Sequence, residues 1–173
     1  GDVDGDGLDD FAISLPQAPG LLAGAGAIVI VQGRRDWPED VNLDDAGVVL
    51  ARLLGSRLNE QLGSELAPAG DVNGDGALDL VAATYPSSDL GRVYLFYGGK
   101  TLAGEIDAEL RVLAGGGVML DIADGFKAFQ SLHAAPAGDT NADGFNDVLI
   151  GVEGGGEATE GVTYLIRGGA NLP

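Results

Sequence analysis

The amino-acid sequence predicts an all-β fold built from four-stranded antiparallel sheets. The first observation is composition: 30 glycines and seven prolines separate short runs rich in β-branched and aromatic residues, a pattern typical of strands joined by tight turns. The second is an acidic pattern that recurs three times at nearly constant spacing. The third is that each recurrence is followed by the same succession of apolar runs. With 173 residues, 45% of them hydrophobic, the chain is long enough for one domain with a sizeable core.

The repeat is marked by an acidic loop that begins after Gly1, Gly70 and Gly138. The three segments read GDVDGDGLDD, GDVNGDGALD and GDTNADGFND. Their first aspartates lie 69 and 68 residues apart. A fixed period of this kind indicates that each unit forms the same supersecondary structure.

Four strands, A to D in chain order, account for each unit. One apolar run follows each loop directly, and a second begins and ends with glycine. The second runs occupy 26–33, 91–98 and 161–168. Upstream of a loop, the matching segments 62–70 and 129–138 predict strand A, and 48–54 and 109–115 are candidates for strand D. The chain is therefore expected to read BCD, ABCD, ABC.

Four short strands per unit are typical of the blade of a β-propeller. We expect one propeller segment over 1–173, with blades at about 1–54, 55–115 and 116–173. Three blades form an incomplete ring and leave exposed sheet edges, which proteins normally avoid. Further blades in a longer chain, or neighbouring protein subunits, are expected to cover them.

The loops have the spacing of calcium ligands. Ca²⁺ takes six to eight oxygen ligands, and alternate residues of a tightly turned loop can direct side chains to one centre. Counted from the first Asp, positions 1, 3, 5 and 9 supply side-chain oxygens, position 7 supplies a main-chain carbonyl, and position 6 is a turn glycine. The predicted ligands are Asp2, Asp4, Asp6, Leu8 and Asp10; Asp71, Asn73, Asp75, Ala77 and Asp79; and Asp139, Asn141, Asp143, Phe145 and Asp147. Up to three calcium ions are expected.

Two further kinds of calcium loop do not fit this spacing. An EF-hand would place Glu at position 12, where this chain has Ile13, Ala82 and Ile150. Stacked nonapeptide repeats are excluded by the long period. The remaining alternative is acidic surface turns without metal, since Asp, Asn and Gly favour turns. Against it, carboxylates that face one another repel unless a cation lies between them.

Charge and composition exclude several functions. The formal charge is −18, from 27 acidic against nine basic residues, so binding to nucleic acid or to an anionic membrane surface is not expected. Without cysteine there is no disulfide, thiolate metal site or cysteine nucleophile. No apolar run is long enough for membrane insertion as a helix.

The pre-loop strand ending in Ala-Gly, the loop, and the glycine-led strand ending in Tyr-Gly or Arg-Gly together resemble the FG-GAP repeat. That resemblance covers nearly the whole chain and implies blades of an integrin α-type β-propeller, a repeat that also builds many bacterial surface proteins; a bacterial source is the expectation. It implies that each calcium loop joins strands A and B of a blade, with the ligands named above.

Other signals point to no active site. Gly98-Gly99-Lys100-Thr101 resembles the end of a phosphate-binding loop, but the required first glycine would fall at Tyr94 within a strand. Gly24-Ala25-Gly26 precedes a strand instead of a helix. His133, the only histidine, shares a predicted strand face with Ser131, and a packed or surface role is favoured over a catalytic pair. Trp37, in an acidic loop at 34–47, is a loop anchor or a sugar-contacting aromatic.

The leading hypothesis is a non-enzymatic, calcium-binding module of a secreted or cell-surface protein, with a role in structure, adhesion or assembly. The alternatives are a lectin-like, carbohydrate-binding propeller and the non-catalytic part of a larger secreted enzyme. Because the first loop begins at Asp2 with no strand before it, that loop is expected to be the frayed one and the other two well ordered.

Overall fold

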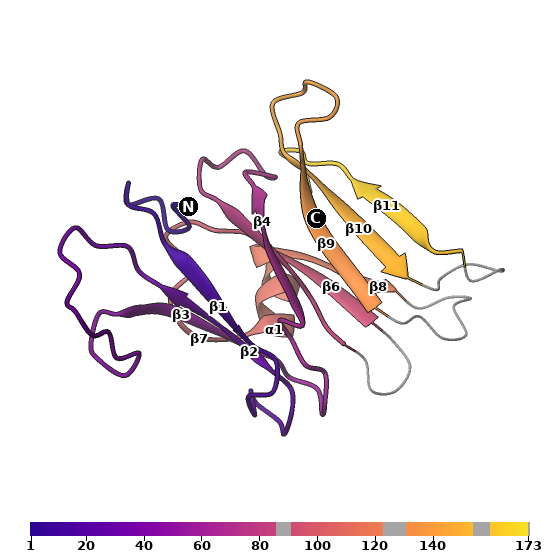
Figure 1. Ribbon diagram of the computed structural model, residues 1–173. Coiled ribbons are helices and arrows are strands. Elements are labelled where there is room, and N and C mark those ends of the chain that lie inside the picture. The colour runs from indigo at the N-terminus through magenta and orange to yellow at the C-terminus, as the bar shows by residue number, and fades with distance from the viewer. Residues whose placement is uncertain (86–90, 123–130, 154–159, 173) are drawn as a thin grey trace.

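The computed structural model describes residues 1–85, 91–122, 131–153 and 160–172 and contains three twisted sheets side by side (Figure 1). The first has the order β1-β2-β3-β7, the second β4-β5-β6-β8 and the third β11-β10-β9. The strands are β1 (Phe11–Leu15), β2 (Ala27–Val31), β3 (Val49–Leu54), β4 (Glu65–Gly70), β5 (Asp79–Ala83), β6 (Gly91–Phe96), β7 (Gly104–Asp107), β8 (Gly117–Ile122), β9 (Ser131–Gly138), β10 (Asp147–Glu153) and β11 (Val162–Ile166). These sheets confirm the all-β fold class and are consistent with propeller blades.

The second sheet is apolar on both faces because a sheet packs on each side of it. β5 and β6 are buried along their whole length. On one face, Leu80 and Phe96 pack with Ile28 and Leu53 of the first sheet. On the other, Val81, Ala83, Val93 and Leu95 pack with Val148 and Ile150 of the third. Successive side chains of a strand point to opposite faces, so a continuous apolar run fills both cores.

The fourth strand of the second sheet differs from the expectation. Residues 109–115, a candidate for strand D, form no strand: α1 (Ala108–Arg111) and the π-helical turn η1 (Val112–Gly116) lie there. Asp107 accepts hydrogen bonds from the N–H groups of Glu109 and Leu110, which caps α1. The strand that pairs with β6 is β8, directly after η1.

The first sheet has a fourth strand that the repeat pattern did not predict. β7 pairs in parallel with β3, from Ala51 opposite Gly104 to Leu54 opposite Asp107. The connection between β6 and β8 therefore crosses to the neighbouring sheet before it returns. Its side chains Leu102, Ile106 and Ala108 join the core between the first two sheets.

The remaining predicted strands lie where the repeat places them. Segment 48–54 contains β3, segment 62–70 contains β4, and segment 129–138 contains β9, with 129–130 outside the described residues. Two acidic loops connect β4 to β5 and β9 to β10, and the first leads into β1. All three lie along the upper rim in Figure 1. No helix among the described residues has the length and apolarity to span a membrane.

Candidate metal centre

Each acidic loop curls around the carboxylate at its first position. Asp2 Oδ1 accepts hydrogen bonds from the N–H groups of Gly5 (2.8 Å) and Asp6 (3.0 Å), and Oδ2 accepts one from Gly7 (2.9 Å). In the second loop, Asp71 accepts from the equivalent Gly74, Asp75 and Gly76. In the third, Asp139 accepts from Asp143 and Gly144. The sequence spacing thus produces one conformation three times.

The side chains at positions 3 and 5 continue the curl. Asp4 Oδ1 accepts from the N–H of Asp6 (3.0 Å), and Asp6 Oδ1 accepts from the N–H of Leu8 (2.8 Å). The equivalent bonds are made by Asn73, Asp75 and Ala77, and by Asn141, Asp143 and Phe145. Each carboxylate oxygen has a second lone pair, so these bonds orient the side chains and leave oxygen sites for a cation.

Position 6 has the predicted left-handed backbone, and position 4 shares it. Gly7, Gly76 and Gly144 have φ of 89°, 86° and 94°. At position 4, two loops have glycine and the third has Ala142, with φ of 60°. A side chain in this conformation is strained by roughly 1 kcal/mol, which explains why glycine is favoured at both positions. The left-handed conformation at position 4 was not predicted.

The aspartate at position 9 is a buried clamp as well as a candidate ligand. Asp79 is fully buried; its Oδ2 accepts from the N–H of Val72 and its Oδ1 from the N–H of Gly98, both at 2.8 Å. Asp10 accepts in the same way from Val3 (2.8 Å) and Gly33 (2.7 Å). The position-9 side chain therefore ties the start of its own loop to the end of the second apolar run.

The third loop repeats the clamp. Asp147, also fully buried, accepts from the N–H groups of Thr140 and Gly168, each at 2.9 Å, and from the Thr140 hydroxyl. Its pKa is lowered, first by the Thr140 hydroxyl and then by the two N–H groups. Hydrogen bonds to the charged form favour it.

The glycine that ends each second apolar run is required by this clamp. A Cβ on Gly33 would lie 2.4 Å from the carbonyl oxygen of Asp9, and one on Gly98 2.5 Å from that of Leu78. On Gly168 it would lie 2.3 Å from the carbonyl oxygen of Asn146. The recurring glycine was visible in the sequence as a strand end; its partner, the position-9 aspartate, was not identified there.

Burial and mutual repulsion raise the pKa of two loop carboxylates. Burial raises the pKa of Asp79 to about 6 against the opposing effect of its two N–H bonds, and the charges of Asp75 and Asp71 add to the rise. The pKa of Asp4 is also raised, first by burial and then by Asp10, Asp6 and Asp2. A cation among these oxygens would reverse the repulsion.

The first loop brings the most carboxylates together. Oxygens of Asp2, Asp4 and Asp10 all lie within 4.8 Å of one another, the only such group of acidic or histidine side chains among the described residues. In the other two loops position 3 is an amide, and its Nδ2 donates to the position-5 carboxylate, at 3.0 Å from Asn73 and 2.8 Å from Asn141. A set of hard oxygens at this density fits Ca²⁺.

Neighbouring loops are joined by a repeated pair of backbone hydrogen bonds. The carbonyl oxygens of Asp2 and Val3 accept from the N–H groups of Leu78 (2.9 Å) and Gly99 (2.7 Å). One unit later, the carbonyl oxygens of Asp71 and Val72 accept from Asn146 (2.9 Å) and Gly169 (2.8 Å). The loops are thus part of the junctions between sheets.

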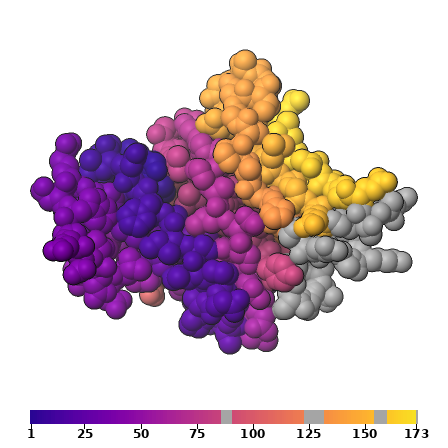
Figure 2. Space-filling model, viewed as in Figure 1, coloured from indigo at the N-terminus to yellow at the C-terminus, as the bar shows by residue number. Residues whose placement is uncertain are grey.

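The first loop, for which fraying is predicted, is closed by hydrogen bonds in the structure. Its internal hydrogen bonds match those of the second, and its carbonyl groups are held by the following loop. Asp4 is buried, whereas the equivalent Asn141 of the third loop is exposed. In the space-filling view the third loop stands above the rest of the surface, orange at the top of Figure 2. Position 3 is therefore more covered in the first loop than in the third.

The remaining motifs have structural surroundings. Gly98 and Gly99 belong to the turn after β6, where Gly98 donates to Asp79 of the second loop and Gly99 to the Val3 carbonyl of the first. His133 Nδ1 lies 3.1 Å from Glu65 Oε1 on the neighbouring sheet, and the side chain of Ser131 is not described. Trp37 is 42% exposed and contacts Phe11 (ring centroids 5.7 Å apart) and the Arg34 guanidinium (5.2 Å), which anchor its loop.

Comparison with known proteins agrees with this architecture. The model of the FG-GAP repeat matches residues 62–96, which include the second loop and β4 to β6. The chain is 29% identical to integrin alpha-V of Gallus gallus over 98% of its own length and 15% of that protein. It is 30% identical to integrin alpha pat-2 of Caenorhabditis briggsae (97% and 13%) and 31% identical to integrin alpha-PS2 of Drosophila melanogaster (97% and 11%). The chain therefore spans less than a sixth of the length of these relatives.

Proposed function

Since the chain carries an FG-GAP repeat and is homologous to integrin α-subunits over nearly its whole length, we propose that it is a calcium-binding β-propeller segment with an adhesion or assembly role at the cell surface. The observation that carries the proposal is the threefold recurrence of one loop conformation that gathers oxygen ligands at a junction of sheets. Calcium there would neutralise the loop carboxylates and strengthen the junction.

The proposed location follows from the chemistry of the metal. Calcium-binding modules of extracellular proteins work with dissociation constants of about 10⁻⁴ to 10⁻³ M, which extracellular calcium fills. The composition agrees, because a surface with charge −18 attracts cations. The proposed role is non-enzymatic, because the relatives that match nearly the whole chain are integrin α-subunits.

Thermal unfolding with calcium, with magnesium and with excess chelator tests the proposal. A ligand that binds only the folded state adds about 2.7 kcal/mol per site at 100 times its dissociation constant. We expect calcium to raise the unfolding midpoint by more than about 5 °C and magnesium to have a much smaller effect, because Mg²⁺ demands a tighter octahedral shell. Equal midpoints with calcium and chelator would refute the proposal.

A matched pair of variants assigns the effect to the loops. Asp6→Asn removes a charge at ligand position 5, and Asp9→Asn removes the same charge at position 8, outside the ligand set; both residues are exposed. We expect the calcium-dependent stabilisation to shrink in Asp6→Asn and to persist in Asp9→Asn. Equal losses would indicate a general charge effect instead of a defined site.

Carbohydrate binding is a second candidate, favoured by the half-exposed pair of Trp37 and Phe11. Aromatic faces of this kind can stack on sugar rings, but Arg34 already occupies part of the space over Trp37. A glycan array that compares the protein with its Trp37→Ala variant tests this role. Sugar binding that disappears in the variant would support it.

A further inference from the structure

We propose that the residue immediately before the strand-ending glycine sets the calcium affinity of each loop, so that the three sites form a graded series. These residues are Gln32, Tyr97 and Arg167. The first site is expected to be the tightest and the third the weakest. The inference rests on the proposed calcium-binding function and adds a determinant that lies outside the nine-residue loop.

The clamp brings this residue to its loop. In each unit, the glycine N–H is bound by the position-9 aspartate, at 2.7 to 2.9 Å for Gly33, Gly98 and Gly168. The residue one step earlier is therefore held beside the same ligand set. Its side chain is a neutral amide in the first unit, a neutral phenol in the second and a positively charged guanidinium in the third.

Gln32 contacts the first loop directly. Its Nε2 lies 3.3 Å from Asp4 Oδ2 and 3.4 Å from Asp6 Oδ2, which are side chains at ligand positions 3 and 5. A neutral amide orients these carboxylates without competing with a cation through charge. Rotation of the amide would also turn its oxygen toward the same centre.

Tyr97 is the neutral counterpart in the second unit. The side chain is only 8% exposed, and its hydroxyl has no hydrogen-bond partner among the described residues. Tyr97 directly precedes Gly98, whose N–H donates to Asp79 Oδ1 at 2.8 Å. A buried hydroxyl that lacks a partner at this position is suited to a water molecule held by a bound cation.

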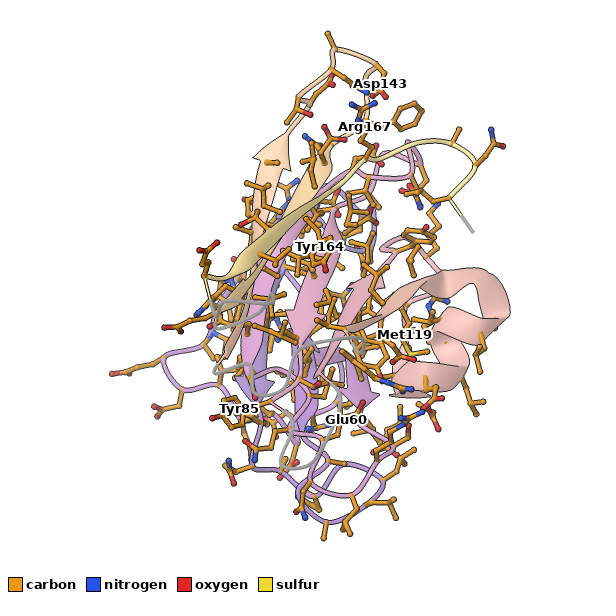
Figure 3. All side chains as sticks on the ribbon, turned by 90° about the vertical axis from the view of Figure 1, so that its right-hand side faces the viewer. Glu60, Tyr85, Met119, Asp143, Tyr164 and Arg167 are labelled. Atoms are coloured by element: carbon orange, nitrogen blue, oxygen red, sulfur yellow. The ribbon has the colours of Figure 1, made fainter. Side chains whose placement is uncertain are left out.

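Arg167 places a positive charge at the third loop. Figure 3 shows Arg167 and Asp143 at the same end of the third sheet. Arg167 directly precedes Gly168, whose N–H donates to Asp147 Oδ1 at 2.9 Å. By Coulomb's law, a unit charge about 8 Å from a divalent cation weakens binding about fivefold in water. The third site therefore binds calcium against a resident cation.

Two further differences favour the same order. The first loop has four carboxylates where the others have three and an amide, and calcium affinity rises with ligand charge. The first and second loops are also held by the loop that follows each of them. The role of the preceding residue must therefore be tested by exchanging that residue while every loop ligand is kept.

Calcium titration followed by amide NMR gives the affinity of each site. The N–H groups of Gly7, Gly76 and Gly144 each donate to the first aspartate of their own loop, at 2.9 Å, so their signals report the three sites separately. The titration is run on the protein and on two exchange variants, Gln32→Arg and Arg167→Gln. Arg57→Gln is the control, since it removes the same positive charge as Arg167→Gln. Arg57 pairs with Glu109 and not with a loop carboxylate.

We expect Gln32→Arg to weaken the site reported by Gly7 at least about fivefold and Arg167→Gln to tighten the site reported by Gly144 about fivefold. The control should change no site by more than about twofold. If all three signals respond to calcium but Arg167→Gln leaves the Gly144 midpoint unchanged, the inference is overturned and the proposed function stands. If no glycine signal responds at millimolar calcium, the proposed function itself fails.

Discussion

The junction between the first and second sheets is closed by different chemistry at its two ends. At the loop end, the first and second loops gather the carboxylates Asp2, Asp4, Asp6, Asp10, Asp71, Asp75 and Asp79, and none of these forms an ion pair in the described part of the chain. At the opposite end, Arg92 at the start of β6 pairs with Glu109 of α1 (3.1 Å) and Asp121 of β8 (2.6 Å).

The arginine end also contains a buried cluster of hydrogen-bonded polar groups. The Tyr94 hydroxyl donates to Glu60 Oε1 at 2.7 Å, and Glu60 Oε2 accepts from the N–H groups of Ser56 and Arg57. Arg92 and Tyr94 are 4% and 0% exposed. Figure 3 shows Glu60 at the end of the molecule opposite Asp143. This cluster joins β6, α1 and the turn after β3 through groups of the chain itself, with no need for a bound cation.

The difference between the two ends indicates where a bound cation would contribute to stability. β6 connects the two ends, because Arg92 lies at its start and Gly98, bound by Asp79, lies just after its end. One end is neutralised by buried arginine, and at the other the carboxylates accept from backbone N–H groups and neutral amides, with Lys100 lining the pocket between Asp4 and Asp75. We therefore expect changes at the loop end to alter calcium dependence and changes at the arginine end to alter stability equally with and without calcium.

The largest effect is expected from Asp79→Ala. This change leaves the N–H groups of Val72 and Gly98 buried without their acceptor and also removes a ligand. Each unsatisfied buried donor costs about 1–3 kcal/mol, so we expect a loss of about 4 kcal/mol in chelator and a larger loss in calcium. Denaturant unfolding in both conditions measures it.

The matched control is Asp75→Ala at exposed position 5 of the same loop. Because Asp75 is not the position-9 clamp, Asp75→Ala should lower the free energy of unfolding by less than about 1 kcal/mol in chelator. The decrease should be larger only in calcium. Comparable losses for the two variants in chelator would contradict the clamp role assigned to position 9.

A loss of about 3 kcal/mol is expected from Arg92→Met, which leaves Glu109 and Asp121 without their buried partner. The loss should be the same in calcium and in chelator, because this end has no candidate ligand. Arg57→Met is the control: its pair with Glu109 is half exposed and worth under about 1 kcal/mol. A calcium-dependent effect of Arg92→Met would erase the contrast between the two ends.

The contrast also shows what sequence can predict. The loop conformation was predictable because all the candidate ligands fall within nine residues and recur, and so were the strands on either side, where apolar runs meet glycine. The arginine end was not, because Glu60, Arg92 and Glu109 are far apart in the chain and meet only through packing. Segment 109–115 differs from the predicted strand for a related reason: it forms α1 and η1, in which Val112 packs against the core whereas Leu110 and Leu113 are exposed.

A smaller effect is expected from Tyr94→Phe. It removes the hydroxyl that donates to Glu60, a carboxylate only 7% exposed, while the ring keeps its stacking on Phe96 (centroids 5.4 Å apart). Glu60 retains two N–H donors, so the loss should be about 2 kcal/mol and independent of calcium. Phe96→Leu, which alters packing at the same place but breaks no hydrogen bond, separates the two contributions.

The smallest effect is the pH dependence of the free energy of unfolding, which should have opposite signs without and with calcium. The pKa of Asp79 is raised to about 6 by burial, whereas in the unfolded chain it has its ordinary value of 3.8. Without calcium, the folded state takes up a proton between pH 7 and 5 and the unfolded state does not, so stability rises by about 1 kcal/mol. With calcium the bound carboxylate must be ionised, so the same change of pH lowers stability.

Unfolding at pH 7 and pH 5, in chelator and in calcium, measures the two slopes. Glu109 and Asp147 have lowered pKa values, so their contributions are lost only below about pH 4.5 and lie outside this window. Asp4 has a raised pKa and acts in the same direction as Asp79. His133→Gln, which removes the one histidine, should leave both slopes in place. A fall in stability from pH 7 to pH 5 in chelator would mean that the loop carboxylates are neutralised without calcium, and the comparison of the two ends would fail.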